Sequence, residues 1–237
     1  MAPAPTFDSI PDAISAFARG DFIIVLDSES RENEGDLIIA ASALTPPKAS
    51  FLIHHSSGYL CAPLPSSLAD KLDLPPMIAP TANSDPNRTA YTVTIDAAEA
   101  VTTGISAADR SATCQKLASA GAKAEDFRRP GHVVPLRAVA GGIRQRQGHT
   151  EAAVEFCRLA GIEPRVGVIA ELVEGTEVVE GLAEMEATGM MRRDECLAFG
   201  KKYGIKVVTI EDLVRYVEEK EGKWEGKGLQ EVALPSV

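Results

Sequence analysis

Near the start of the chain stand the apolar run Phe22-Ile23-Ile24-Val25-Leu26, the charged segment Arg31-Glu32-Asn33-Glu34-Gly35-Asp36 and a second apolar run, Leu37-Ile38-Ile39-Ala40-Ala41. Two apolar runs joined by a charged segment predict two buried strands and the turn between them. Three carboxylates so close together repel one another, and they persist most naturally where a cation or a polyhydroxylated substrate holds them together. The turn is therefore a candidate site. The alternative is a solvated acidic hairpin loop, because acidic surface turns are common.

The composition and charge exclude several classes of protein. With 237 residues, of which 45% are hydrophobic, the chain can bury the core of one large domain. A formal net charge of −10 argues against partners such as nucleic acid or an anionic membrane, which are bound through an overall positive field. No apolar stretch approaches the ~18 residues that span a bilayer, and no signal peptide is recognisable. We expect a soluble cytoplasmic protein with reduced thiols, because its four cysteines are widely spaced and form no paired motif.

Local signals predict the remaining elements. Capping residues and helical spacing predict helices over Ser9–Gly20, Thr45–His55, Ser106–Gly121, His149–Ala160 and Glu211–Glu219. Alternating or β-branched residues predict strands over Thr89–Asp96, Val133–Leu136, Val166–Ala170 and Val207–Ile210.

Two further stretches predict irregular structure. Residues 61–88 are rich in proline and predict a long loop with at most a short helix around Leu68. Long ordered loops often cover sites. Residues 171–186 predict an exposed acidic excursion.

The segment Gly141–Thr150 forms a second candidate constellation, since it joins two glycines, two arginines and His149 to the start of a predicted helix. Free N–H groups at a helix start bind anions, and nearby arginines add charged hydrogen bonds, so the segment predicts a phosphate site. His149 can ligate a metal, act as a base or only bond locally. The turn Arg129-Pro130-Gly131-His132 supplies another histidine with the same alternatives.

Several ordered segments carry a resemblance to a known family: Asp27–Asp36, Asp73–Pro75, Thr92–Ile95, Val101–Arg110, Arg129–Val133 and Gly148–Ala152. From about Ser9 to Val217 the chain resembles the 3,4-dihydroxy-2-butanone 4-phosphate synthases of riboflavin biosynthesis, in their eukaryotic monofunctional form. These enzymes convert D-ribulose 5-phosphate to L-3,4-dihydroxy-2-butanone 4-phosphate and formate. The resemblance implies a single α+β domain over residues 1–222, a three-layer α/β/α arrangement with a mixed central sheet. Residues 223–237 are expected to form a mobile tail.

The resemblance also implies the site residues. Glu32 and His149 would bind the metal, which the family indicates is Mg²⁺, although an imidazole ligand suits Mn²⁺ as well. His132 and Glu171 would have catalytic roles. The residues implied to contact the sugar phosphate are Arg31, Asp36, Arg146, Gln147, Gly148, Thr150 and Glu171. No organic cofactor is expected.

The resemblance further implies a homodimer with active sites near the subunit interface, in which His132 reaches the metal site of the other subunit. Two departures stand out: Gln147 replaces a second glycine that is usual before His149, and the acidic excursion after Glu171 is longer than in bacterial relatives. No cyclohydrolase extension with clustered cysteines is expected after residue 220.

The chemistry explains why such residues are required. Removal of a proton beside the C2 carbonyl of a ketose phosphate leaves an enediolate, whose charge needs a cation or hydrogen-bond donors. In our hypothesis a base of the carboxylate cluster takes the C3 proton and the C1 hydroxyl is lost. A skeletal shift then joins C3 to C5, and C4 leaves as formate after hydration. His132 and Glu171 would shuttle protons.

Two other functions remain open at this stage. A metal-dependent sugar-phosphate isomerase or aldolase would use the same acidic turn and phosphate site, but isomerisation releases no formate. A nucleotide- or RNA-binding module, as in the threonylcarbamoyl-adenosine synthesis proteins, predicts a basic groove, whereas this chain is acidic.

Overall fold

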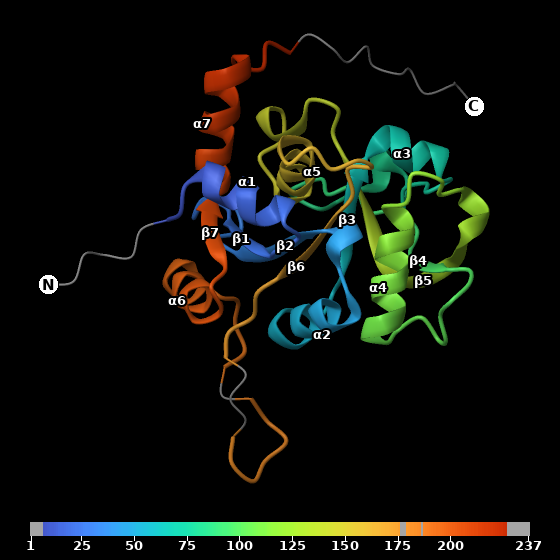
Figure 1. Cartoon of the computed structure of the whole chain (residues 1–237), viewed down its shortest axis with the longest axis horizontal. Helices are drawn as coiled ribbons and strands as arrows, with labels where there is room; N and C mark the ends of the chain where they lie inside the picture. The colour runs from blue at the N-terminus through green and yellow to red at the C-terminus, as the bar shows by residue number, and fades with distance from the viewer. Residues whose placement is uncertain (1–6, 176–178, 186, 227–237) are drawn as a thin grey trace, which may run out of the picture.

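One mixed sheet of seven strands organises the protein (Figure 1). The structure is a computed structural model and describes residues 7–175, 179–185 and 187–226. In these residues the strand order is β4-β5-β3-β6-β2-β1-β7. The strands are β1 Ile23–Leu26, β2 Gly35–Ala40, β3 Cys61–Pro65, β4 Ile95–Ala97, β5 Phe127–Ala138, β6 Gly167–Glu171 and β7 Lys206–Thr209.

Seven α-helices and four short 3₁₀ helices accompany the sheet in the described residues. The α-helices are α1 Ile10–Ala18, α2 Pro46–His55, α3 Ser66–Lys71, α4 Ala107–Leu117, α5 His149–Leu159, α6 Arg193–Tyr203 and α7 Ile210–Glu221. The 3₁₀ helices are η1 Ala41–Ala43, η2 Pro80–Ala82, η3 Ala124–Asp126 and η4 Gly142–Arg144.

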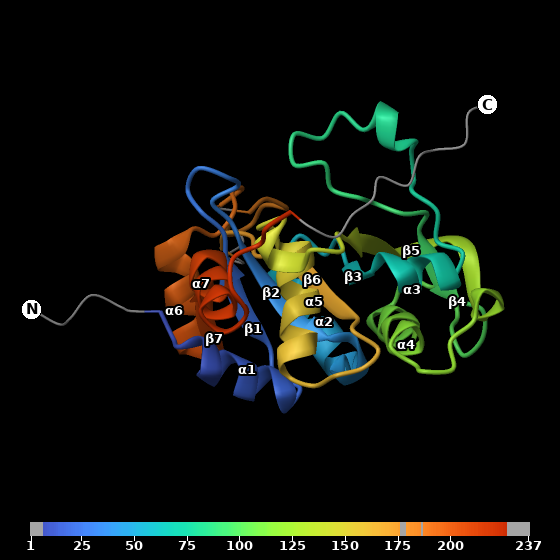
Figure 2. The same cartoon turned by 90° about the horizontal axis from the view of Figure 1, so that it is seen from above.

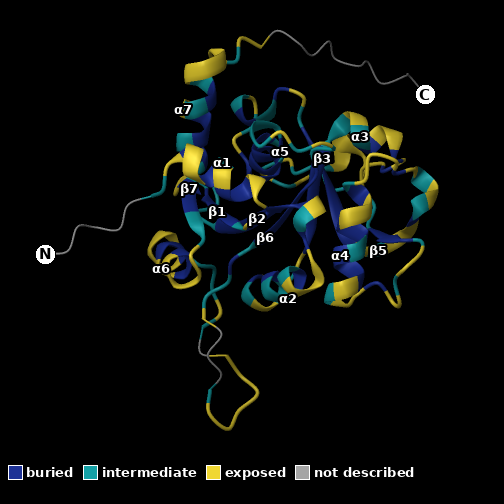
Figure 3. Ribbon diagram, viewed as in Figure 1, coloured by how far each residue is buried: buried dark blue, intermediate teal, exposed yellow. Residues whose placement is uncertain are grey.

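The helices cover both faces of the sheet. Apolar side chains of α1, α5 and α7 pack on one face, and those of α2, α4 and α6 pack on the other. Figure 3 shows the sheet as a buried layer between helices whose outer faces are exposed. The packing follows from amphipathic helices that each bury one stripe of side chains. The expected three-layer α+β fold with a mixed central sheet is confirmed.

The first two strands form the predicted hairpin. β1 and β2 are antiparallel, and Leu26 pairs with Gly35 while Val25 pairs with Asp36. Gly35 and Asp36 therefore belong to strand β2, and the turn itself ends at Glu34. Asp36 is therefore a strand residue and not a turn residue. The pleat of the sheet fixes the direction of its side chain, and the residue is 1% exposed.

The prediction of a long loop over residues 61–88 is wrong in its first part. Residues 61–65 form the inner strand β3, whereas helix α3, Ser66–Lys71, is the short helix predicted around Leu68. Pro63 and Pro65 argued against a strand because they lack an N–H group. β3 tolerates them because its second neighbour, β6, pairs with it only at Cys61. The rest of the stretch carries η2 and extends outward from the body of the protein (Figure 2).

The strands at the β4 edge also differ from the prediction. A strand over Thr89–Asp96 was expected, but only Ile95–Ala97 forms β4, and Tyr91 and Thr92 make isolated bridges. Conversely, β5 is 12 residues long where four were expected. Pro135 does not interrupt β5. The segment beside it forms only an isolated bridge, between Tyr91 and Leu136, and the carbonyl of Pro135 accepts a hydrogen bond from the Thr92 N–H at 3.1 Å.

The helices agree more closely with the sequence. Ser9 and Ser106 cap α1 and α4 with their side chains, as expected. α4 ends at Leu117 and not at Gly121. Of the acidic excursion, residues 180–185 are exposed, while 176–178 and 186 lie outside the described residues. Most of the predicted tail, 227–237, also lies outside them.

All four cysteines are free and buried. None of the helices in the described part of the chain has the length and apolar character needed to cross a bilayer.

Close packing between α6 and the hairpin generates a first prediction. A Cβ atom on Gly35 would lie 2.5 Å from Cys196 Sγ, so Gly35→Ala should destabilise the protein by about 1–3 kcal/mol. Urea unfolding measures the change. Gly121→Ala is the matched control, because a Cβ there meets nothing within 4 Å. Adding Cys196→Ala should recover part of the loss, and a Gly35→Ala protein as stable as the wild type would contradict the packing.

Candidate active site

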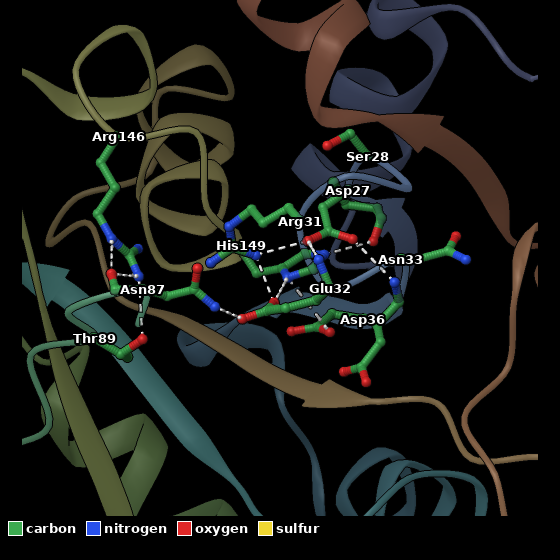
Figure 4. A network of polar contacts seen from close by, with 12 residues as sticks. Asp27, Ser28, Arg31, Glu32, Asn33, Asp36, Asn87, Thr89, Arg146 and His149 are labelled. Atoms are coloured by element: carbon green, nitrogen blue, oxygen red, sulfur yellow. Dashed lines mark hydrogen bonds and ion pairs between the residues drawn. The ribbon is translucent and has the colours of Figure 1, made fainter. Parts of the chain in front are cut away.

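Asp27 organises the turn between β1 and β2. Its side chain is 1% exposed, and Oδ1 accepts a hydrogen bond from the Glu34 N–H at 2.9 Å. Oδ2 accepts from the Glu32 N–H at 3.0 Å and from Arg31 Nη1 at 2.8 Å (Figure 4). An aspartate that binds N–H groups farther along its own chain stabilises a turn. Sequence reasoning assigned Asp27 no role, although its place directly after an apolar run was the available signal.

His149 meets this turn from the first residue of α5. Its Nδ1 lies 3.7 Å from Glu32 Oε2 and 3.7 Å from Asp36 Oδ1. Its Nε2 lies 3.2 Å from the carbonyl oxygen of Val25. A carbonyl can only accept, so Nε2 carries a proton and donates it, and Nδ1 faces the carboxylates. The predicted convergence of Glu32 and His149 is present in the structure.

The three groups perturb one another strongly. Contact with His149 lowers the pKa of Glu32 to about 2, against the effect of burial. Burial raises the pKa of Asp36 to about 7, although the charge on His149 opposes this. Burial lowers the pKa of His149, but Asp36 and Glu32 outweigh it and raise the value to about 9. The ring is therefore charged at neutral pH, and a cation that binds Nδ1 must displace a proton.

The residues around Nδ1 fit a divalent cation. Asp27, Glu32 and His149 offer ligand atoms within 4.8 Å of one another. Both oxygens of Asp27 already accept hydrogen bonds, whereas Asp36 Oδ1 is buried without a hydrogen-bond partner among the described residues. Asp36 Oδ1 and His149 Nδ1 thus converge with Glu32, whose two oxygens accept hydrogen bonds from Arg31 and Asn87. Carboxylate oxygens suit Mg²⁺, and the imidazole suits Mn²⁺ as well.

A cavity beside this cluster brings most of the predicted site residues together. Its lining includes Arg31, Glu32, Asp36, Arg146, His149, Thr150 and Glu171. It also includes residues that sequence reasoning did not select, among them Cys61 and Tyr91. The predicted residues Gln147, Gly148 and His132 do not line it.

Gln147 and Gly148 have different surroundings. Gln147 is exposed, so its departure from the family pattern leaves the cavity unchanged. Gly148 is the N-cap of α5, and a Cβ there would lie 2.5 Å from Arg146 Nη1. A glycine is therefore required for the close approach of the arginine.

The arginines of the site are held by carboxylates. Arg31 Nη1 pairs with Asp27 and Glu32. Arg146 Nη1 donates to the buried Glu151 at 2.6 Å, and its Nη2 donates to the carbonyl oxygen of Asn87 at 3.1 Å. Positive charge thus lines the cavity in an acidic protein, because each guanidinium is anchored on an internal anion.

Asn87 links the projecting loop to the site and was missed from the sequence. Its Nδ2 donates to Glu32 Oε1 at 2.6 Å, while its carbonyl accepts from Arg146 (Figure 4). The residue lies within the stretch expected to be a loop that covers a site. No pattern in that stretch distinguished Asn87 from its neighbours.

Glu171 is the last residue of β6 and pairs with Asp36 of β2 across the sheet. Its Oε2 accepts a hydrogen bond from the Ser57 hydroxyl at 2.7 Å. Glu171 therefore lines the cavity from the end of β6, which agrees with its predicted position at the end of a strand.

His132 lies apart from the cluster. The sheet register forms a row through Val134, Cys61, Ile169 and Ile38 on β5, β3, β6 and β2. Two residues from this row, toward one end of the strands, lie His132 on β5, Glu171 on β6 and Asp36 on β2. Glu171 and Asp36 are paired across the sheet and face the side of α5, whereas the register between β5 and β4 is irregular next to His132. Three strand spacings, about 14 Å, separate His132 from Asp36 within one chain.

Comparisons with known proteins agree with this geometry. Residues 11–216 match the model of the 3,4-dihydroxy-2-butanone 4-phosphate synthase family. The enzyme of that name from Pyricularia oryzae is 55% identical over 227 residues, covering 95% of this chain and 96% of the relative. The Saccharomyces cerevisiae enzyme is 48% identical, covering 90% of this chain and all of the relative.

A crystal structure of a 3,4-dihydroxy-2-butanone 4-phosphate synthase in complex with two magnesium ions superimposes with a TM-score of 0.89 at 56% identity. It covers 92% of this chain and 100% of that chain. With the fold, the acidic hairpin and the helix-start histidine all in place, the chain belongs to the 3,4-dihydroxy-2-butanone 4-phosphate synthase family.

Proposed function

We propose that this chain converts D-ribulose 5-phosphate to L-3,4-dihydroxy-2-butanone 4-phosphate and formate in riboflavin biosynthesis. The observation that carries this proposal is the approach of His149 Nδ1 to Glu32 and Asp36, each at 3.7 Å, beside a cavity lined by arginines. Carboxylates, an imidazole and guanidinium groups are the set that a reaction through an enediolate of a sugar phosphate requires.

Glu32 and His149 hold the cation in this proposal, and Mg²⁺ is the ion that acts. Asp36 supplies a further oxygen ligand or binds a hydroxyl group of the sugar, because its Oδ1 is without a hydrogen-bond partner among the described residues. A divalent cation bound here supplies Lewis-acid stabilisation of the charge that develops on the substrate oxygens. Mn²⁺ can replace Mg²⁺, since an imidazole ligand suits it.

The phosphate binds beside the start of α5. Thr150 and Arg146 line the cavity there, and N–H groups at a helix start attract anions. Arg31 is anchored on Asp27, and its guanidinium lies beside Gly148, as that of Arg146 does. Gly148 contributes its backbone, and Gln147 lies at the exposed edge. The substrate thus lies with its phosphate toward α5 and its hydroxyl groups toward the turn.

Protons move through carboxylates and a histidine. A carboxylate of the turn takes the C3 proton, and the C1 hydroxyl leaves as water. C5 then migrates from C4 to C3, so that the C3–C5 bond forms as the C4–C5 bond breaks. Water adds to the C4 carbonyl, and cleavage of the C3–C4 bond releases C4 as formate. Glu171, held by Ser57, exchanges protons with the rearranging carbons. His132 is the second acid and base. Each such group contributes a factor of about 10² to 10⁴ in rate.

We infer that the active form is a homodimer in which His132 acts on the site of the other subunit. The separation of about 14 Å between His132 and Asp36 within one chain supports this, because a proton donor must lie within hydrogen-bonding reach. The site would be incomplete in a monomer.

The proposal places the enzyme in the cytoplasm, where the four free, buried cysteines stay reduced. It requires no organic cofactor and no nucleic-acid or membrane partner. The catalytic unit in this proposal is residues 1–222.

Formate release tests the reaction directly. Purified protein with Mg²⁺ and ribulose 5-phosphate should produce formate and a four-carbon phosphate in equal amounts, which ¹³C NMR of uniformly labelled substrate measures. Added EDTA should stop the reaction. Appearance of xylulose or ribose phosphate without formate would indicate an isomerase.

The metal ligands are tested by substitution. Glu32→Ala and His149→Ala should abolish Mg²⁺-dependent turnover and weaken Mn²⁺ binding more than about tenfold, as measured by EPR of free Mn²⁺. Glu29→Gln is the matched control, because Glu29 is an exposed carboxylate of the same turn. Unchanged Mn²⁺ affinity in both alanine variants would refute the ligand assignment.

Subunit mixing tests the shared site. His132→Ser should slow turnover by a factor of about 10² to 10⁴ and leave the fold intact by circular dichroism. Refolded together in equal amounts, His132→Ser and Glu32→Ala chains should regain about a quarter of wild-type activity, because heterodimers contain one intact site. Inactive mixtures, or an active monomer in sedimentation, would contradict the homodimer.

A further inference from the structure

His132 has one side-chain partner in the described structure, Asp96. Asp96 Oδ2 lies 2.7 Å from His132 Nδ1, and Asp96 Oδ1 accepts a hydrogen bond from the His132 backbone N–H at 2.8 Å. Asp96 is 7% exposed, whereas the His132 side chain is 39% exposed. One carboxylate therefore holds both the backbone and the ring of His132, and it does so from a buried position.

The local sheet geometry makes this contact possible. The β4–β5 register shifts between Ile95 and Asp96, and such irregularities redirect side chains. A Cβ on Gly131 would lie 2.0 Å from the Ile95 carbonyl carbon and 2.2 Å from the Asp96 nitrogen. Only glycine permits the two strands to approach this closely. The residue before His132 is thus required for Asp96 to reach the ring.

The loop before α4 covers the contact. Gly104, at φ +95°, packs so closely that a Cβ would lie 2.0 Å from Asp96 Oδ2 and 2.6 Å from His132 Nδ1. Asp109 holds this loop by accepting hydrogen bonds from the N–H groups of Thr102 at 3.0 Å and Gly104 at 3.1 Å. The Asp96–His132 hydrogen bond is therefore shielded from water by backbone, which strengthens it.

We propose that Asp96 is a positioning residue for the reaction: it holds His132 in the tautomer that carries its proton on Nδ1, so that Nε2 presents a lone pair for a substrate proton. A carboxylate accepts from Nδ1–H, which leaves Nε2 as the basic nitrogen of the neutral ring. When Nε2 takes a proton, the adjacent carboxylate stabilises the imidazolium and itself stays ionised. This inference rests on the role proposed for His132.

The test replaces the carboxylate by its amide. In Asp96→Asn the amide oxygen still accepts from the His132 backbone N–H, but the amide nitrogen facing Nδ1 can only donate. The ring should then protonate on Nε2 and lose its basic nitrogen at the working position. The expected result is a fall in kcat of about 10² with KM unchanged.

Two readouts separate positioning from a general structural effect. ¹⁵N NMR of histidine-labelled protein, with the His132 signals assigned by their absence in His132→Asn, should show the ring proton moving from Nδ1 to Nε2 in Asp96→Asn. The double variant Asp96→Asn with His132→Asn should be no slower than His132→Asn alone, because Asp96 acts only through the ring.

Asp126→Asn is the matched control. Asp126 lies directly before β5 and accepts a hydrogen bond from the Lys123 N–H at 3.0 Å without touching a histidine, so its kcat should equal that of the wild type. Wild-type kcat in Asp96→Asn, an additional loss in the double variant, or an unchanged ring tautomer would overturn the proposal. Full turnover by His132→Asn would contradict the proposed function instead, and the ring-nitrogen spectrum would still decide whether Asp96 sets the tautomer.

Discussion

The hydrogen bond from His149 Nε2 to the carbonyl oxygen of Val25 is the constraint on which the candidate site depends. It joins the first turn of α5 to the end of β1, two segments far apart in the sequence. Because this hydrogen bond occupies Nε2, it directs Nδ1 toward the carboxylates of Glu32 and Asp36. The buried backbone therefore determines which imidazole nitrogen is available to a cation, and no other side chain is needed to orient the ring. A helix that began one residue later would turn the ring away from the hairpin.

An acidic protein that binds an anionic substrate must place its positive charges locally. Here each guanidinium of the cavity is compensated by a carboxylate of the fold: Arg31 by Asp27, and Arg146 by the buried Glu151. These pairs fix the arginines in place, so that less side-chain freedom is lost when a phosphate arrives. Arg146 also donates hydrogen bonds to the carbonyl oxygen of Asn87 and to the Thr89 hydroxyl, which ties the projecting loop to the same anchor. If Arg146 binds the phosphate as proposed, phosphate affinity and the position of the loop are coupled.

The sequence predicted those elements that local chemistry specifies. The cap residues Ser9 and Ser106 predicted the starts of α1 and α4, and the apolar runs beside the charged turn predicted the hairpin. The failures have tertiary causes. β3 reads as a proline-rich loop because nothing local shows that its second neighbour pairs with it at a single residue. Likewise Asn87 and Asp96 bind partners more than 30 residues away, and no spacing rule reveals such contacts. The convergence of Glu32 with His149 was predictable only from the resemblance.

The way Asp27 holds its turn from within leaves the side chains of the outer residues of that turn at the surface. Ser28, Glu29 and Ser30 are exposed, while the backbone of the turn is bound from within. All four native cysteines are buried. A thiol introduced by Glu29→Cys would therefore be the accessible one for a maleimide dye, mounted within a few residues of Glu32. Fluorescence from that position would report ion arrival and loop movement in real time, without any substrate turnover.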